Sequence, residues 1–543
     1  MNIACAHLSL APALTALGHT VLALRPPGGP ARIEPLLGGF VPDLFIQQET
    51  LGPRTLFTDL PSLGCPKVFW SIDTHLNSFW QLPYARLFDL FCTTQRHWRD
   101  WFAERGVART LWLPWCGVLR ESTPWDSRRS GMVFVGRVTP ERPVRGWFLD
   151  WLREAGEVEV RQDLGFEAML ELYGRSRIVP NESIFEEVNF RLFEAASCAC
   201  AVVNPAVPGV EELFLPGEEV ALYRDGAELA WWVRRLLADD RLARGMGLRA
   251  LARVRREHLP EHRARTLLAA AADLPRRAVE GPAADSALWL TVFQLWECGR
   301  LAMAVEGMER ALAGLSLTDE ILAALLRLRA RKGCGEFMRL AVPVAETGQY
   351  ASSLEVNLAG SMGAVQCGDM TLARLFFLRH RRECAPGAAD PGRTPLSICL
   401  AWAGELQRSG RPFRPGRVFA SGEDLPASAL ECLILASEHA PDDGGVYREM
   451  SRILARHDGW DGLRLQVLSW LSLREPRDWR LGVELGVTDC RAFRVRQGLE
   501  ELAAARLEAA RQGQEARFDR TLTAMDQSGR IRALLEPLTI SAT

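Results

Sequence analysis

Short apolar runs alternate with segments of helical periodicity over the first 120 residues of this chain. Each run is short enough for a buried strand, and the apolar positions between runs recur at helical spacing. Strands that alternate with helices predict a parallel sheet covered on both faces. We therefore expect a first Rossmann-like α/β domain over residues 1–122. Its predicted strands carry the sequences NIACA, TVLAL, DLFIQ, KVFWSI, LFDLFCTT and LWLPW.

A second α/β pattern follows the polar, turn-rich segment 123–131. Its strand-like runs are MVFVG, VEVRQ, SRIVP and CAVVN, and long helical segments close it near Leu274. We expect a second Rossmann-like domain over residues 130–274. Ligands of open α/β sheets bind beyond the carboxyl ends of the strands, so two such domains joined by a hinge predict a ligand cleft.

Strand patterns almost vanish after the linker-like segment PRRAVEGPAAD at 275–285, and amphipathic helices run to the end. Gly299, Gly333 and Gly368 each follow a helix-like segment, at spacings of 34 and 35 residues. This period is typical of two-helix repeats of the tetratricopeptide kind. We expect an all-α repeat domain over residues 287–543, in which these glycines allow one helix to pack closely on the next.

Composition narrows the classes of partner and compartment. The formal net charge is −2, and this nearly neutral balance gives no indication of a nucleic-acid partner. Thirteen cysteines occur without a CxxC pair, and several lie in apolar runs, which is typical of buried reduced thiols. No apolar run reaches the ~18 residues that a membrane span needs. We expect a cytoplasmic protein without a membrane span.

The segment from Glu186 to Pro216, EEVNFRLFEAASCACAVVNPAVPGVEELFLP, carries the strongest indication of function. Glu186 and Glu194 lie eight positions apart across the start of a predicted helix. A carboxylate beside a strand end can accept from both hydroxyls of a ribose. Gly209 opens a further helix, whose free N–H groups and positive end suit a phosphate. The segment therefore predicts a site for a nucleotide-linked substrate.

Arginines follow the first strand of the second domain. Arg137 ends the run FVGR, and Arg142 and Arg145 come shortly after it. Arginines at this position can stabilise the negative charge of a leaving diphosphate. The alternative for Arg142 and Arg145 is a solvated surface. Glu194, flanked by apolar residues, is either a buried functional carboxylate or a helix-edge residue that reaches solvent.

In the first domain, WSIDTH places Asp73 and His75 between a strand and a loop. Either can bind an acceptor or accept a proton. The alternative is a helix-capping Asp73 and a surface His75. No metal site is expected: His258 and His262 are separated by Pro260 and have no evident third ligand.

Together these motifs resemble the GT-B glycosyltransferases, specifically the retaining family-4 type and its spore-maturation CgeB-like branch. Glu186 and Glu194 match that family's pair of glutamates separated by seven residues. Gly136, Arg137, Glu141 and Arg142 echo its Gly-Arg…Glu-Lys-Gly turn. The runs KVFWSIDTHLN and FRLFEAASCACAVVNPAVPGVEELFLPGEEVALY also resemble the branch, and the likeness extends over about residues 1–274.

The resemblance implies a nucleotide-sugar donor as substrate, no cofactor, and retention at the anomeric carbon. Arg137, Arg142 and Gly209 would hold the donor diphosphate, Glu194 the ribose, and Glu186 the donor sugar. Asp73 and His75 would serve the acceptor side. The acceptor could be a protein or a cell-surface glycan, and the helical domain could bind a protein partner.

One departure from the family favours a different class of function. The family's glycine-rich turn after the first strand is replaced by AHLSLAP. The alternative is therefore a non-catalytic scaffold, with a degenerate transferase half and a protein-binding helical half.

Overall fold

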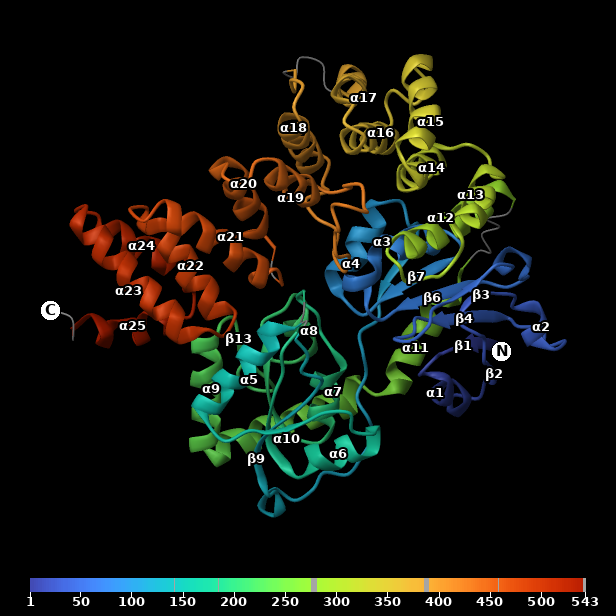
Figure 1. The fold of residues 1–543 in the computed structure, drawn as a ribbon. Helices are drawn as coiled ribbons and strands as arrows, with labels where there is room; N and C mark the ends of the chain where they lie inside the picture. The colour runs from blue at the N-terminus through green and yellow to red at the C-terminus, as the bar shows by residue number, and fades with distance from the viewer. Residues whose placement is uncertain (141, 184, 275–280, 385–389, 458, 541–543) are drawn as a thin grey trace. The chain divides into compact units, whose positions relative to one another are not determined.

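The computed structural model describes residues 1–140, 142–183, 185–274, 281–384, 390–457 and 459–540. Two compact units make up the chain, and neither is continuous in sequence. The first unit contains Met1–Thr94, Trp98–Trp112 and Leu268–Ile453. The second contains Gln95–His97, Leu113–Leu267 and Leu454–Thr543. Each unit thus combines one α/β domain with part of the helical region (Figure 1).

The first unit is built on a six-stranded parallel sheet of order β2-β1-β4-β6-β7-β8, and β3 pairs with β5 in a separate parallel pair (Figure 1). Its central strands β4 and β6 are buried at every residue, as expected of strands that are covered on both faces. The strands are β1 (Asn2–Ala6), β2 (Thr20–Leu24), β3 (Gly29–Ala31), β4 (Leu44–Gln48), β5 (Thr55–Phe57), β6 (Lys67–Ser71), β7 (Leu90–Thr93) and β8 (Thr110–Trp112).

The second unit contains a five-stranded parallel sheet of order β10-β9-β11-β12-β13. Successive strands extend the sheet to one side of β9 and then to the other, so the order reverses between β9 and β11. Ligands of doubly wound sheets bind at such a reversal. The strands are β9 (Ser130–Val135), β10 (Glu159–Arg161), β11 (Ser176–Pro180), β12 (Ala201–Pro205) and β13 (Ala221–Tyr223).

Helices connect the strands of both sheets. In the second unit α5 packs against α9, and α7 packs against α10. The helices up to the end of the α/β part are α1 (Ala11–Ala16), α2 (Glu34–Leu37), η1 (Leu60–Ser62), α3 (Thr74–Ala85), α4 (Arg96–Glu104), η2 (Trp125–Ser127), α5 (Pro143–Ala155), α6 (Phe166–Gly174), α7 (Phe190–Ser197), α8 (Val210–Leu213), α9 (Gly226–Ala238), α10 (Asp240–Glu257) and α11 (Pro260–Ala271).

From residue 282 onward the described elements are helices. They are α12 (Pro282–Glu297), α13 (Val305–Ala313), α14 (Asp319–Lys332), α15 (Cys334–Thr347), α16 (Leu354–Gln366), α17 (Met370–Cys384), α18 (Pro395–Arg408), α19 (Ala429–His439), α20 (Gly444–Leu454), α21 (Asp461–Arg474), α22 (Trp479–Arg491), α23 (Val495–Arg511), α24 (Glu515–Met525) and α25 (Arg530–Ile540). The predicted fold class, two parallel α/β domains followed by an all-α region, is confirmed. Residues 275–280 of the predicted linker lie outside the described residues.

The three repeat glycines end helices rather than bring helices together. Gly299, Gly333 and Gly368 follow α12, α14 and α16 at φ values of 71°, 122° and 77°. A Cβ at any of them would meet no atom within 4 Å. The expected packing role is therefore wrong, because what these positions require is a left-handed backbone after a helix. The tetratricopeptide identity of the repeat stays a prediction.

The helical region shares a hydrophobic core with each sheet domain. In the first unit, residues of α12, α13 and α14 join the core of the first sheet. In the second unit, α22 to α25 join the core that contains α5 and α9. Phe493 packs its ring 5.0 Å from that of Phe148 and 6.0 Å from that of Tyr223. The domain boundaries 1–122, 130–274 and 287–543 stay a prediction.

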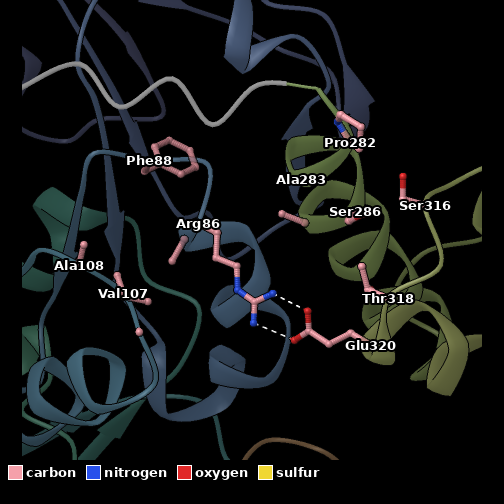
Figure 2. A pocket seen from close by; sticks show the side chains of 13 residues that line it. Arg86, Phe88, Val107, Ala108, Pro282, Ala283, Ser286, Ser316, Thr318 and Glu320 are labelled. Carbon is pink, nitrogen blue, oxygen red and sulfur yellow. Dashed lines mark hydrogen bonds and ion pairs between the residues drawn. The ribbon is translucent and has the colours of Figure 1, made fainter. Parts of the chain in front are cut away.

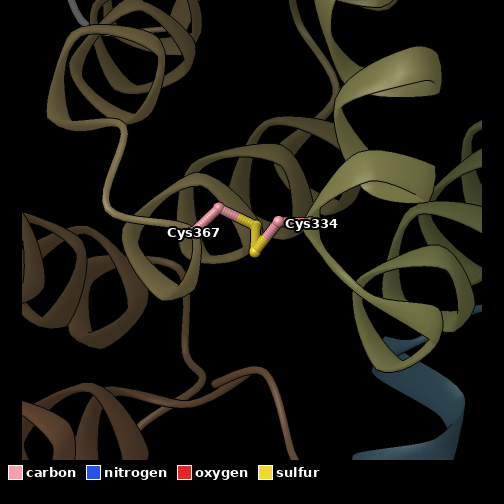
Figure 3. Close-up of a disulfide and its surroundings, with 2 residues drawn as sticks. All are labelled: Cys334 and Cys367. Atoms are coloured by element: carbon pink, nitrogen blue, oxygen red, sulfur yellow. A yellow bond between two sulfur atoms is a disulfide. The ribbon is translucent and has the colours of Figure 1, made fainter.

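The cysteines follow the sequence expectation in part. Cys5, Cys92, Cys399 and Cys432 are buried free thiols, as their apolar context predicts. Cys334 and Cys367, at the start of α15 and the end of α16, instead form a disulfide (Figure 3). The prediction of uniformly reduced cysteines is wrong for this pair, because their separation in sequence hides that the two helix ends meet. Among the described helices, none combines the length and apolar character that a membrane crossing requires.

Candidate functional site

Polar side chains cluster where the second sheet reverses its order. Strand β9 leads into Gly136 and Arg137, and β11 leads into Asn181 and Glu182. These four residues lie beyond the carboxyl ends of neighbouring parallel strands. This edge is where an open α/β sheet binds its ligand.

A buried ion pair joins the two strand ends. The Arg145 Nε donates to Glu182 Oε2 at 2.8 Å, and Nη2 of Arg145 lies 2.6 Å from the same oxygen. Arg145 also donates to the carbonyl of Arg137 at 3.0 Å. Both side chains of the pair are buried, so the solvated-surface alternative is wrong for Arg145. The pair fixes the turn that carries Arg137.

Arg191, from the first turn of α7, forms a second link across this edge. Its Nε donates to the carbonyl of Val135 at 3.0 Å, and its Nη1 donates to Asn181 Oδ1. A Cβ at Gly136 would lie 2.9 Å from Arg191 Nη2. Glycine at 136 thus leaves the space that the buried guanidinium occupies.

Arg137 and Arg142 remain at the surface of this edge. Arg137 pairs with Asp163 at 2.9 Å, but the two side chains are 77% and 68% exposed. Arg142 is exposed and precedes the first residue of α5, a 13-residue helix with no acidic residue in its first turn. A helix start and exposed arginines beside a strand end together suit an anion. Glu141, the remaining residue of the predicted turn, lies outside the described residues.

Glu194 is buried in α7, with 7% of its surface exposed. The alternative of a solvent-reaching glutamate is therefore wrong. Burial raises the pKa of Glu194 to about 7, and the nearby Arg191 charge only partly opposes the rise. The Oε2 atom of Glu194 has no hydrogen-bond partner within the described structure. A buried carboxylate oxygen left in this state is costly unless a ligand donates to it.

Glu186 lies on the short segment between β11 and α7. Its φ is 55°, and that of Phe185 is 53°. Two successive left-handed residues that are not glycine are uncommon, and such backbone conformations gather at ligand-binding sites. The Glu186 side chain is half-buried. Residue 184 lies outside the described residues.

Gly209 begins α8 with a φ of 91°, as its predicted place before a helix requires. However, α8 spans only Val210–Leu213 and carries two glutamates in its first turn. Glu212 pairs with Arg96 at 2.8 Å. Because a four-residue helix has little dipole and these carboxylates repel anions, the geometry at Gly209 favours a phosphate less than the start of α5 does.

Asp73 and His75 lie in the first unit, between β6 and the first turn of α3. Asp73 is at the N-cap position, but its side chain makes no capping hydrogen bond, so the capping alternative is wrong. His75 is buried and not a surface residue. The backbone N–H groups of Ile72 and Asp73 both donate to Glu49 Oε2 at 2.9 Å. Burial and the charge of Asp73 raise the pKa of Glu49 to about 7.

The helical region contacts the same turn. Arg300 donates to Asn77 Oδ1 at 2.9 Å and to the carbonyl of Gly416 at 2.6 Å. A Cβ at Gly416, whose φ is 72°, would lie 2.1 Å from the Leu76 carbonyl oxygen. Residues after α12 and α18 thus hold the start of α3.

Sequence reasoning missed Asn181, Glu182, Arg191 and Glu49. Asn181 and Glu182 directly follow the predicted strand SRIVP, and Glu49 follows DLFIQ after one residue. Their place after a buried strand was the available signal. Arg191 offered none, because its partners come from two other strands.

The first unit also contains an open cavity of about 480 Å³, lined among others by Arg86, Phe88 and Ser286 (Figure 2). It lies between the turn before β7 and helix α12, beside the ion pair of Arg86 and Glu320 at 2.6 Å. Asp73 and His75 do not line it. Since it lies by the amino end of β7, it is away from the strand ends at which such sheets bind substrates.

Comparison with known protein families finds a match in the second α/β domain. Residues 128–269 match the family model described as glycosyl transferase-like. This span contains β9 to β13 and each residue of the cluster described above. The match supports glycosyl transfer for this part of the chain. No curated protein matches the chain in sequence.

Several solved structures resemble about half of the chain. Sucrose-phosphate synthase from Thermosynechococcus elongatus has a TM-score of 0.38 at 15% identity, covering 49% of this chain and 97% of its own. Anabaena HepE, in complex with UDP and glucose, has a TM-score of 0.37 at 16% identity, covering 50% and 100%. A glycosyltransferase from Rickettsia africae has a TM-score of 0.39 at 12% identity, covering 50% and 98%.

Proposed function

We propose that this protein transfers a sugar from a nucleotide-diphosphate donor to an acceptor. The unpartnered, buried Oε2 of Glu194 carries the proposal. In its ionised form that carboxylate can accept hydrogen bonds from a ribose, and ligand hydroxyls would supply the partners that the protein does not. The glycosyl transferase-like match over residues 128–269 supports the same activity.

Arg137, Arg142 and the start of α5 are proposed to hold the donor diphosphate. Both arginines are exposed at the carboxyl end of β9, and neither is committed to a buried pair. Positive charge here stabilises the negative charge that the diphosphate gains as it leaves. We propose that these groups, and no metal ion, supply this stabilisation, so a chelator should leave turnover unchanged.

Glu186 is proposed to contact the donor sugar, and Asp73 and His75 to serve the acceptor. We also propose that the configuration at the anomeric carbon is retained. Determining the anomeric configuration of the product tests this. An acceptor presented by the helical region, whether protein or glycan, stays a prediction.

A thermal-shift panel of nucleoside diphosphates and nucleotide sugars tests the donor site. A ligand at a hundred times its dissociation constant stabilises the folded state by about 2.7 kcal/mol, which raises the melting temperature by a few degrees. We expect one nucleotide class to stabilise wild type. Glu194→Gln keeps the shape of the side chain but removes its charge, so the stabilisation should fall.

Glu171→Gln is the matched control, because Glu171 is an exposed glutamate of the neighbouring helix α6. It should respond to the panel as wild type does. If the panel leaves well-folded wild-type protein unchanged, the proposed donor site is wrong, and the scaffold alternative gains support. If Glu194→Gln binds as wild type does, the ribose role of Glu194 is wrong.

A further inference from the structure

The segment that carries Glu186 has a backbone conformation that is intrinsically unfavourable for its residues. Phe185 and Glu186 have φ values of 53° and 55°, and neither is glycine. Side chains disfavour this left-handed region, and a pair of such residues persists only where surrounding structure requires it. The surrounding structure must therefore supply a contact that holds the pair.

That contact comes from the helical region of the same unit. Gly459 and Trp460 immediately precede α21, and the Trp460 ring lies 5.3 Å from the Phe185 ring, inclined at 59°. A Cβ at Gly459 would lie 2.7 Å from Phe185 Cα and 2.8 Å from Phe185 N. Gly459 thus brings its backbone against the backbone of Phe185, which a larger residue cannot do.

Gly459 and Trp460 are connected to the hydrophobic core of the second unit through the helix that follows them. Helix α21 packs against α22, and α22 contributes Trp479, Val483 and Val487 to the core shared with the second sheet domain. The contact on Phe185 is thereby connected to the same core as the strands that carry the site. Because both segments pack within the same unit, a change at Trp460 can be transmitted to Glu186.

We propose that Gly459 and Trp460 are positioning residues, which hold Phe185 and Glu186 in the left-handed conformation needed for sugar transfer. The effect on catalysis rests on the proposed function, whereas the effect on the backbone does not. The helical region is then a working part of the donor site. It acts on the sugar-binding segment and leaves the ribose-binding Glu194 and the arginines in place.

Hydrogen exchange in the full-length chain tests the backbone claim without any substrate. Gly459→Ala and Trp460→Ala should increase the exchange rate of peptides covering residues 180–190. Gly513→Ala is the matched control, because Gly513 also has a positive φ, 67°, but a Cβ there would meet no atom within 4 Å. Trp460→Phe keeps a ring against Phe185 and should exchange as wild type does.

Kinetics test the functional claim. With the nucleotide sugar that stabilises wild type, Trp460→Ala should lower kcat by about tenfold to a hundredfold, since a misplacement of about 1 Å can cost that much. The affinity for the matching nucleoside diphosphate should stay within about twofold, because its proposed ligands are elsewhere. Trp460→Phe should restore most of kcat. A general loss of structure would weaken nucleotide binding as well and would not be rescued selectively.

The exchange and kinetic results test separate parts of the proposal. Unchanged exchange of residues 180–190 in both Gly459→Ala and Trp460→Ala overturns the proposal. Faster exchange with unchanged kcat overturns the catalytic role of the contact. If wild type binds no nucleotide, the proposed function fails, yet the exchange experiment still decides whether Gly459 and Trp460 hold the segment. If Gly459→Ala does not fold, the two Trp460 variants decide alone.

Discussion

Replacing Glu194 by glutamine should change how the stability of this protein depends on pH. Burial raises the pKa of Glu194 from its ordinary 4.5 to about 7. The folded protein therefore keeps a proton that the unfolded chain loses in this interval. The stabilisation from this proton is complete below pH 4.5 and is lost as the pH rises through 7.

The expected magnitude follows from the shift. Between pH 5 and pH 8 the wild-type carboxyl should lose roughly 2–3 kcal/mol of stabilisation. Glutamine is neutral at both values and loses none. Relative to wild type, the Glu194→Gln variant should therefore gain roughly 2–3 kcal/mol on going from pH 5 to pH 8, which corresponds to a relative rise of several degrees in melting temperature.

Melting curves followed by circular dichroism at both pH values measure this difference. Glu49 also has a pKa of about 7, but it titrates equally in both proteins and cancels. Glu171→Gln, at an exposed position, should follow wild type at both pH values. A difference between Glu194→Gln and wild type that is the same at pH 5 and pH 8 would refute the reasoning. Nucleotide affinity should also rise with pH through about 7 more steeply in wild type than in Glu194→Gln, because the terminal phosphate of the ligand, which titrates at about pH 6, is the same in both experiments.

Three other perturbations give expected outcomes. Arg145→Ala leaves Glu182 buried and unpaired and should destabilise the fold by about 3–5 kcal/mol. Arg137→Ala removes an exposed pair and should change the free energy of unfolding by about 0.5 kcal/mol or less. Urea unfolding measures both variants, and equal losses of stability would contradict the burial argument. Gly416→Ala should lower the melting temperature by several degrees, because its Cβ would meet the Leu76 carbonyl. Gly410→Ala is the control and should lower it less, because Gly410 has a similar φ of 70° but the nearest atom to its Cβ would be 3.9 Å away. Similar melting of the two variants would mean that backbone strain alone, and not the clash, determines the loss. Dithiothreitol should remove about 3–4 kcal/mol of stabilisation by reducing the Cys334–Cys367 disulfide, which spans 33 residues. The stability of Cys334→Ser should not depend on the reductant. If the melting temperature of wild type is the same with and without dithiothreitol, the disulfide is not formed.

The alternation of apolar runs and helical segments was sufficient to predict both parallel sheets. Strands buried on both faces leave a simple pattern, and the connecting helices force the strands to be parallel. For Glu194 the apolar neighbours Leu192, Phe193 and Ala195 indicated a buried carboxylate, but the sequence left a solvent-reaching side chain as the alternative. These features depend on residues close together in sequence.

Features that depend on distant partners were not predictable in this way. Nothing local to Arg191 indicates that Val135 and Asn181 will accept from it. Arg145 has the sequence context of a surface residue, and its partner Glu182 is 37 residues away. The periodicity of α22 to α25 marks an apolar face but does not show that the second sheet domain covers it.

The shared core of the second unit bears on how the chain folds during synthesis. Residues 113–267 emerge from the ribosome well before Phe493, Leu502 and Ile531, which complete their core. At about 5–20 residues per second, that interval lasts roughly 10–50 s. During this time the apolar surfaces of α5 and α9 that these residues later cover remain available for wrong contacts. The second unit thus depends on residues 454–543, and ribosome stalling before them should leave an aggregation-prone intermediate even though the family-like segment has been fully translated.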